Sequence, residues 1–374
     1  MRIIEICLAP SLGGLELYFE KCCLWFHKSP HTAICIVKKE SRLEGRLVNA
    51  SIPVSILSSP SKWMSIFNAY KLANIIENNN VDIVHVHHKD DLLLTALTKI
   101  ISKKKFLLVH SRQMQIPHSK KDPWHKFIYK KIDLFLTITE KLKADAIKNI
   151  PLDPQRIKNL YYGVKAPTNY DPKNCFPFFK MDAADPKKFK IGIFSRLEYL
   201  KGQHLVVHAA HMLQSAYPDL IYYFIGDSMS KDYLMKLKAS IKEYKLEGTI
   251  LFKGFHPNPL EIMPAFDLIL LPSYNETFGL VLAEAMRAGV AVVGTDAGGV
   301  TEIIDHKTTG LLFKKDDAKD LANQIALLYN DEPLRKLLAK NGKEKADAVF
   351  DEEVHFYKFE EILESEILNK KVKS

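Results

Sequence analysis

The stretch DLILLPSYNETFGLVLAEAMRAG, residues 267–289, contains one complete unit of the fold. Its first part, 267–273, is a short apolar run that is typical of a buried strand. A turn follows at 274–277, and a helix rich in small residues then runs to about Ala288, where Gly289 ends it. A strand, a turn and a helix in this order predict a parallel sheet that is covered by helices on both faces.

The same alternation of strands and helices fills the chain on both sides of this stretch. Short runs rich in Ile, Val and Leu are followed by segments with helical spacing, for example at 15–27, 63–76 and 92–101. The tail from Asp331 to Lys370 has an almost wholly helical pattern. The predicted strands are 2–9, 32–38, 81–88, 105–110 and 133–139 in a first series, and 190–195, 220–226, 249–255, 267–273 and 290–296 in a second.

A proline-rich segment separates the two series. Residues 167–188 contain four prolines and a repeated DPK, which is typical of a linker. The sequence therefore predicts an α/β protein with two doubly wound domains. In such folds ligands bind outside the carboxyl ends of the strands, so we expect a site in a cleft between the domains. The predicted boundaries are 1–168 for the first domain, 169–188 for the linker, 189–350 for the second domain and 351–374 for a terminal helix.

Composition limits the function classes. No apolar run approaches the roughly 18 residues of a membrane-spanning helix. The amino terminus does not read as a signal peptide, because Glu5 and Pro10 interrupt its apolar run. Five cysteines without a CxxC pair favour reduced thiols. We therefore expect a cytoplasmic protein.

The positive charge is concentrated in the first half of the chain. Residues 1–170 hold 26 Lys and Arg against 14 Asp and Glu, whereas the remainder carries a net charge of −3. Basic clusters at 103–105, 120–121 and 130–131 are accompanied by aromatic residues such as Trp124. This pattern fits a solvated basic face, a nucleic-acid surface or a surface for anionic lipid. Because no nucleic-acid-binding motif is present, we favour lipid and expect peripheral attachment to the inner face of a membrane.

In each predicted domain, one pair of candidate residues follows the first strand. Gly13 and Gly14 allow a ligand to approach the backbone at a helix start, although a simple tight turn explains them equally well. Arg196 and Lys201 follow the strand at 190–195, where both side chains can reach a phosphate over the sheet. Two unrelated surface cations are the alternative for this pair.

The opening stretch carries two carboxylates. Glu276 lies on the turn. It either faces a ligand or is simply a first-turn carboxylate that the helix dipole stabilises. The backbone N–H groups of residues 277–280 are predicted to be free at the helix start. Glu284 lies about two turns into an apolar helix, so it needs a polar partner such as a pair of ligand hydroxyls.

Further polar residues are predicted at other strand ends. Glu302 follows a glycine pair in TDAGGVTEIID, which is a candidate for anion or ribose contact or another turn. His110 is predicted to end the strand 105–110 and to orient a sugar or donate a hydrogen bond. His85 and His87 share one strand face, but no clustered cysteine or carboxylate completes a site, so we expect no metal. The absence of an Asp-x-Asp motif agrees with that expectation.

Together these residues resemble the retaining GT-B glycosyltransferases of family 4. The run NETFGLVLAE matches the most specific motif of that family, and Arg196 with Lys201 matches its diphosphate-binding pair. Gly13 and Gly14 match its amino-domain glycine loop, His110 its cleft histidine, and AGGVTEII its later glycine-rich stretch.

The resemblance implies an enzyme that takes a sugar from a UDP-, GDP- or ADP-sugar and needs no other cofactor. Arg196 and Lys201 would neutralise the leaving diphosphate in place of a metal ion. Glu276 would bind donor-sugar hydroxyls and Glu284 the ribose, with attack from the leaving-group side. The terminal helix would cross back onto the first domain, which would bind a lipid-linked or lipopolysaccharide-type acceptor. The remaining residues that it implies are Thr277, Phe278, Gly279 and Leu280 for the phosphate or sugar, Lys253, Gly254 and Phe255 for the base, and Arg112, Lys120 and Lys121 for the acceptor.

Two other functions stay open. One is a nucleotide-sugar epimerase or another sugar-nucleotide enzyme on the same scaffold, and the other is a non-catalytic nucleotide-binding protein. The presence of Glu276, Arg196 and Lys201 together argues against a pure binding protein.

Overall fold

The chain folds into two compact units in the computed structural model, which describes residues 1–10, 13–57, 64–167 and 188–373. Unit 1 comprises Met1–Tyr161 and the residues from Phe356 onward, and unit 2 comprises Tyr162–His355. Residues 169–187 of the predicted linker lie outside the described residues.

Each unit is built on one parallel sheet. Unit 1 has seven strands in the order β3-β2-β1-β4-β5-β6-β7, and unit 2 has six in the order β10-β9-β8-β11-β12-β13. The strands of unit 1 are β1 Arg2–Cys7, β2 Thr32–Lys38, β3 Val54–Leu57, β4 Ile83–Val86, β5 Leu107–Arg112, β6 Leu134–Thr137 and β7 Ile157–Asn159. Those of unit 2 are β8 Phe189–Phe194, β9 Leu220–Ile225, β10 Ile250–Gly254, β11 Leu268–Leu271, β12 Ala291–Thr295 and β13 Leu311–Phe313.

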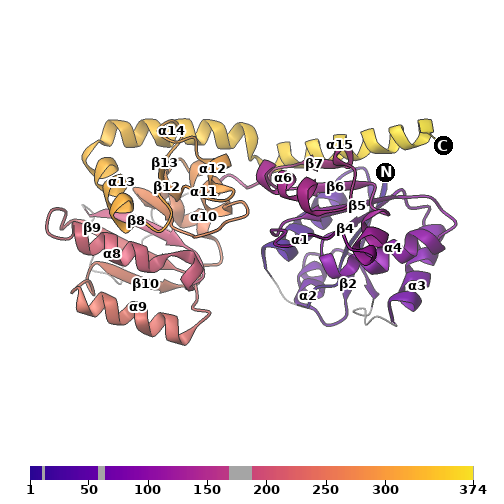
Figure 1. Cartoon of the computed structure of the whole chain (residues 1–374), viewed down its shortest axis with the longest axis horizontal. Coiled ribbons are helices and arrows are strands. Elements are labelled where there is room, and N and C mark those ends of the chain that lie inside the picture. The colour runs from indigo at the N-terminus through magenta and orange to yellow at the C-terminus, as the bar shows by residue number, and fades with distance from the viewer. Residues whose placement is uncertain (11–12, 58–63, 168–187, 374) are drawn as a thin grey trace. The chain divides into compact units, whose positions relative to one another are not determined.

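Helices connect successive strands and cover the sheets (Figure 1). In unit 2, α8 packs against α9 and α13, whereas α11 packs against α12 and α14. The helices of unit 1 are α1 Gly14–Lys28, α2 Arg42–Asn49, α3 Met64–Asn78, α4 Leu92–Ile101, α5 Pro123–Tyr129 and α6 Glu140–Asn149. Those of unit 2 are α8 Gln203–Leu213, α9 Lys231–Glu243, α10 Pro259–Ile262, α11 Leu280–Arg287, α12 Val300–Ile303, α13 Ala318–Asn330 and α14 Glu332–Val349, and α15 Glu352–Lys373 follows. The short 3-10 helices are η1 Lys89–Asp91, η2 Pro154–Arg156, η3 Tyr199–Lys201 and η4 Met263–Ala265.

The apolar runs explain why the central strands form. All residues of β9 and β11 are buried, as expected for parallel strands with helices on both faces. The prediction of two doubly wound Rossmann-like domains is therefore confirmed. Three edge strands, β3, β7 and β13, were not predicted, because they are only three or four residues long. Polar residues also interrupt β3 and β7.

Helix α15 joins the two units. It begins at Glu352 in unit 2, and from Phe356 onward its residues belong to unit 1. There the Trp25 indole N–H donates to Glu360 at 2.8 Å, and the Trp25 ring stacks on Phe356 with centroids 4.8 Å apart. Phe359 is fully buried. These contacts make α15 part of the core of unit 1.

Candidate functional site

The strand order places one switch point in each sheet. In unit 1 the connections leave in opposite directions from the adjacent strands β1 and β4, and in unit 2 from β8 and β11. Ligands of doubly wound sheets bind outside the carboxyl ends of the strands at such a point. Gly13 and Gly14 follow β1, Lys201 follows β8 and Glu276 follows β11. The sequence therefore predicted residues at both switch points.

Lys201 and Glu276 meet at the switch point of unit 2. The Lys201 Nζ lies 2.6 Å from Glu276 Oε1, and the two side chains are 21% and 17% exposed. This partial burial strengthens the charge-assisted hydrogen bond relative to one in open solvent. One contact uses one of the three Lys donors and one carboxylate oxygen, so both groups keep capacity for a ligand. Nothing in the sequence pattern pairs these residues.

A glycine brings the two residues together. Gly202 has φ +73°, and a Cβ atom there would lie 2.0 Å from the carbonyl oxygen of Pro272. The backbone N–H of Tyr274 also donates to the Leu200 carbonyl at 2.9 Å. The turn η3 therefore presses directly on the end of β11, which carries the loop of Glu276.

A second glycine pair supports the Glu276 loop from the other side. Gly298 has φ +67°, and a Cβ atom there would lie 2.3 Å from the Glu276 carbonyl oxygen. The Gly299 N–H donates to the same oxygen at 2.9 Å. The sequence left two roles open for this stretch, which were a ligand contact and a turn. The glycines pack against the backbone of the Glu276 loop. Glu302 follows on α12 and is half-buried.

The helix after Glu276 begins one or two residues later than predicted, at Leu280. Gly279 precedes it with φ +106° and gives no side-chain cap. The Leu282 N–H donates to the Gly279 carbonyl at 2.9 Å, so the N–H groups of Leu280 and Val281 are the ones that this helix start presents to a ligand. The Phe278 ring is buried between Tyr162 and Phe350, so only its backbone is available to a ligand. Glu284 lies in the second turn and is half-buried.

The other predicted donor residues of unit 2 make separate contacts. Arg196, whose side chain is 61% exposed, pairs with Glu198 at 3.1 Å. At the end of β10, Gly254 has φ +66°, and its carbonyl accepts from the Gly226 N–H at 2.7 Å. The Lys253 ammonium lies 5.8 Å from the Tyr223 ring, and the Phe255 ring is 69% exposed. Phe255 therefore offers a flat surface on which a base can stack.

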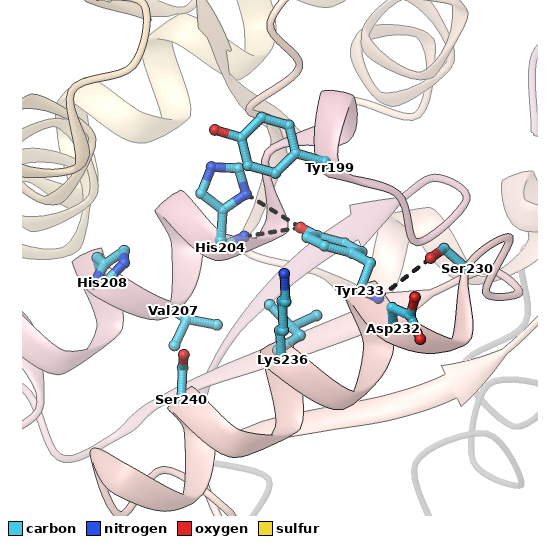
Figure 2. A pocket seen from close by; sticks show the side chains of 10 residues that line it. Tyr199, His204, Val207, His208, Ser230, Asp232, Tyr233, Lys236 and Ser240 are labelled. Atoms are coloured by element: carbon cyan, nitrogen blue, oxygen red, sulfur yellow. Dashed lines mark hydrogen bonds between the residues drawn. The ribbon is translucent and has the colours of Figure 1, made fainter.

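A pocket of about 390 Å³ adjoins this site between α8 and α9 (Figure 2). On its wall His204 contacts the Tyr233 hydroxyl through both its backbone N–H and Nδ1, and its Nε2 lies 3.0 Å from the Tyr274 hydroxyl. The exposed Tyr199 ring stacks on His204 with centroids 4.6 Å apart. Because Tyr274 precedes Glu276 by two residues, this aromatic wall stabilises the Glu276 loop.

His110 differs from its prediction. Strand β5 extends to Arg112, so the prediction that the strand ends at His110 is wrong, and the His110 side chain is fully buried. Its Nδ1 lies 2.9 Å from the Val86 carbonyl, which can only accept, so Nδ1 carries the proton. Burial, assisted by Arg112, lowers the pKa of His110 to about 3. At neutral pH the Nε2 atom is therefore an acceptor rather than a donor, and it is buried without a hydrogen-bond partner among the described residues.

The three predicted acceptor residues also belong to unit 1. The Arg112 guanidinium donates to the carbonyls of Met114 and Gln115 at 2.7 and 2.6 Å, so it shapes its own loop. Lys120 is half-buried and Lys121 is exposed just before α5.

Asp91 was not predicted from the sequence. It precedes α4 at the switch point of unit 1, it is 1% exposed, and its Oδ2 accepts from the Leu8 N–H at 2.9 Å. It therefore holds the chain directly after β1, where the glycine loop begins. The available signal in the sequence was an Asp between the predicted strand 81–88 and the predicted helix 92–101.

The burial of Asp91 predicts that the free energy of unfolding depends on pH. Burial raises the pKa of Asp91 to about 7, so between about pH 4 and pH 7 the folded state keeps a proton that the unfolded state releases. The free energy of unfolding contributed by this group is complete below about pH 4 and falls as the pH rises to about 7. Asp91→Asn keeps an oxygen for Leu8 and cannot ionise. We expect the variant to exceed the wild type in stability at pH 8 by on the order of 2 kcal/mol, and by much less at pH 5.

The measurement is urea unfolding followed by tryptophan fluorescence, because all three tryptophans lie in the first 161 residues. Equal pH slopes for the two proteins would contradict the assignment.

The expectation that no carboxylate or cysteine joins His85 and His87 is wrong. Glu5 on β1 and Cys22 on α1 lie beside both histidines, and the four ligand atoms are within 4.8 Å of one another. The sequence did not reveal this because Glu5 reaches His85 only through the parallel pairing of β1 with β4.

Comparison with known proteins agrees with the fold. Residues 12–166 match the family model described as Glycosyltransferase Family 4, and residues 178–345 match that described as Glycosyl transferases group 1. The chain is 26% identical over 303 residues to the N-acetyl-alpha-D-glucosaminyl L-malate synthase of Bacillus anthracis, covering 79% of this chain and 77% of that protein. It is 28% identical over 268 residues to the lipopolysaccharide core biosynthesis mannosyltransferase LpsB of Rhizobium meliloti, covering 69% and 72%.

A solved structure shows the same fold. Anabaena HepE in complex with UDP has a TM-score of 0.83 with 23% sequence identity, over 98% of this chain and 100% of that one.

Proposed function

The chain belongs to the glycosyltransferases of group 1 and family 4, and from this premise we propose that it moves a sugar from a nucleoside-diphosphate sugar to a lipid-linked or lipopolysaccharide-type glycan. The observation that carries the proposal is the Lys201–Glu276 pair at the switch point of unit 2, next to the start of α11. A cation, a carboxylate and free helix N–H groups are together the contacts that a sugar diphosphate needs.

Each residue of unit 2 has a role in the proposal. Lys201 and the first-turn N–H groups of α11 bind the diphosphate, and the exposed side chain of Arg196 joins them when the donor is bound. Glu276 accepts hydrogen bonds from hydroxyls of the transferred sugar. Glu284 binds the ribose hydroxyls, and the base stacks on Phe255.

The proposed reaction retains the configuration at the anomeric carbon and needs no metal. The acceptor oxygen attacks the anomeric carbon on the side of the leaving group, the bond from that carbon to the diphosphate oxygen breaks, and the diphosphate takes the acceptor proton. Lys201 stabilises the negative charge that develops on the leaving oxygen. Near the acceptor, the bare Nε2 of His110 accepts a hydrogen bond from a sugar hydroxyl.

The relatives support a nucleotide-sugar donor and two kinds of acceptor. HepE was crystallised with UDP and with UDP-glucose, and LpsB is named a lipopolysaccharide core mannosyltransferase. The relative from B. anthracis is named for L-malate, a small dianion. The basic first 170 residues suit either an anionic glycolipid or such a small anion, and we favour the glycolipid because aromatic side chains accompany the charge.

The test of this function begins with a thermal-shift screen of UDP, GDP and ADP, because a ligand that binds the native state raises the melting temperature. We expect one nucleotide to stabilise the protein, and the corresponding sugar nucleotide to be consumed when a lipid-linked glycan is supplied. Consumption with L-malate alone would replace the acceptor proposal. A new isomer of the donor sugar would identify an epimerase, and binding without consumption would identify a binding protein.

We also propose that unit 1 attaches to an anionic membrane surface. No helix in the described part of the chain is long and apolar enough to cross a bilayer. Lys120 and Lys121 precede α5, on which the Trp124 ring is 53% exposed. We expect the protein to float with anionic vesicles at low salt and to lose this binding at high salt.

The matched variants for this prediction are Lys120→Glu/Lys121→Glu and, on α14 of unit 2, Lys336→Glu/Lys340→Glu. The first should lose most vesicle binding and the second should keep it. Equal flotation with neutral and anionic vesicles would remove the membrane proposal.

A further inference from the structure

Four side chains with metal-ligating atoms converge inside unit 1. They are Glu5 on β1, Cys22 on α1, His85 on β4 and His87 directly after β4. Their ligand atoms all lie within 4.8 Å of one another, and each residue is at most 1% exposed. Residues of β1 and α1, together with two histidines in and after β4, therefore meet at one point in the core that is shielded from solvent.

A hydrogen bond joins His87 Nε2 and Glu5 Oε2 at 2.6 Å, but other polar atoms of the cluster stay unsatisfied. The Nδ1 of His85 lies 2.8 Å from Glu5 Oε2 but is not in hydrogen-bond geometry. Glu5 Oε1 and His87 Nδ1 are buried without a hydrogen-bond partner among the described residues. A buried polar atom that lacks a partner costs about 1–3 kcal/mol, and three in one cluster call for an explanation.

The surroundings resemble the outer shell of a metal centre. His85 Nε2 lies 2.8 Å from the Ser111 hydroxyl, which orients the ring and leaves Nδ1 facing the cluster. The Phe19 ring packs edge-on against His87 at 5.2 Å, and Phe359 packs in the same way against His85 at 5.1 Å. A hydrogen bond on the distal histidine nitrogen and an apolar wall are the usual supports of histidine ligands.

We propose that Glu5, Cys22, His85 and His87 bind one zinc ion in the core of unit 1. A thiolate, two imidazoles and a carboxylate match the borderline-soft ligands that zinc takes in four-coordinate sites, whereas magnesium and calcium prefer oxygen alone. Bond lengths of about 2.0–2.3 Å place tetrahedral ligands about 3.5 Å apart, so the 2.6 Å contact from His87 Nε2 to Glu5 Oε2 widens on binding.

Charge balance favours the same ion. Binding releases the Cys22 proton, and the thiolate and the Glu5 carboxylate then neutralise a divalent cation, so no net charge remains in the dry core. With four protein ligands and no solvent exposure, the site is closed, which is typical of a structural rather than a catalytic zinc. The ion joins β1, α1 and β4, and thus holds both ends of the glycine loop that contains Gly13 and Gly14.

The test measures metal directly and does not depend on transferase activity. The full chain is expressed in zinc-supplemented medium, purified without chelator, and analysed for metal by mass spectrometry. We expect about one zinc per chain in the wild type. Cys22→Ser and His87→Ala should fall below about one fifth of that, whereas the sequence neighbours Cys23→Ser and His88→Ala, which lie outside the cluster, should match the wild type.

Cobalt(II) substitution gives a second readout. Cobalt in the wild-type site should show the near-ultraviolet charge-transfer absorption of a thiolate ligand, and Cys22→Ser should lose it while Cys23→Ser keeps it. If the Cys22 variant does not fold, zinc released from the urea-unfolded wild type into a chromogenic chelator still gives the stoichiometry. Wild-type protein that holds no zinc, or equal zinc in the Cys22 and Cys23 variants, overturns the proposal. Loss of transferase activity with full zinc content would bear only on the proposed function.

Discussion

Lys201→Met is expected to lower kcat by about 100-fold and to leave the fold intact. In the proposed reaction Lys201 stabilises charge that develops on the leaving diphosphate, and removing one such donor costs roughly 10²–10³ in rate. Methionine keeps most of the length of the side chain and removes only the charge. The measurement is steady-state kinetics with the sugar nucleotide that the thermal-shift screen selects.

The control for this variant is Lys236→Met, on the rim of the pocket between α8 and α9. It removes a lysine of the same unit that makes no contact with Glu276, so its kcat should stay near that of the wild type. Glu276→Gln should also lose at least tenfold, and the double variant should lose less than the two single losses combined, because the pair acts together. Wild-type turnover in Lys201→Met would remove Lys201 from the catalytic site.

Gly202→Ala is expected to destabilise unit 2 by about 3 kcal/mol or more and to abolish the Lys201–Glu276 contact. The new Cβ atom would lie 2.0 Å from the Pro272 carbonyl oxygen, and alanine is disfavoured at φ +73°. The clash is relieved only if the turn η3 moves away from the end of β11, and this movement separates the two loops that carry the pair. The measurement is the urea midpoint followed by far-ultraviolet circular dichroism.

Gly248→Ala is the matched control, since a Cβ atom there meets nothing within 4 Å. It should change the midpoint little. If Gly202→Ala unfolds at the same urea concentration as Gly248→Ala, the close packing of η3 on β11 is not a constraint on the sequence. In the absence of urea, the Gly202 variant should also lose most of its turnover, because the Lys201 ammonium no longer reaches the Glu276 carboxylate.

Local patterns predicted most of the fold but not the contacts that complete the site. The apolar runs of β9 and β11 are legible in the sequence because every residue in them is buried. The contact between Lys201 and Glu276 is not, because 75 residues separate them and it exists only through the pairing of β8 with β11. The strand end at His110 was predicted too early for a local reason, because the two residues after it are polar but still belong to the strand.

The buried cluster in unit 1 is the clearest example of a site that depends on contacts between residues distant in the sequence. In the sequence, Glu5 is a single charge in an apolar run, and Cys22 is one of two adjacent helical cysteines. Only the register of β1 against β4, with Glu5 opposite His85, shows that the carboxylate has two histidine neighbours.

Helix α15 has a consequence for how the protein is made. Unit 1 consists of two separate chain segments, and the second is synthesised only after all of unit 2. A ribosome that has released residues 1–161 has not yet supplied Phe356, Phe359 or Glu360, so Trp25 lacks its stacking and hydrogen-bonding partners. Unit 2, although later in the chain, is contiguous and can complete its core first. Unit 1 must therefore wait with an exposed apolar seam, and a fragment that stops before α15 is expected to aggregate rather than fold.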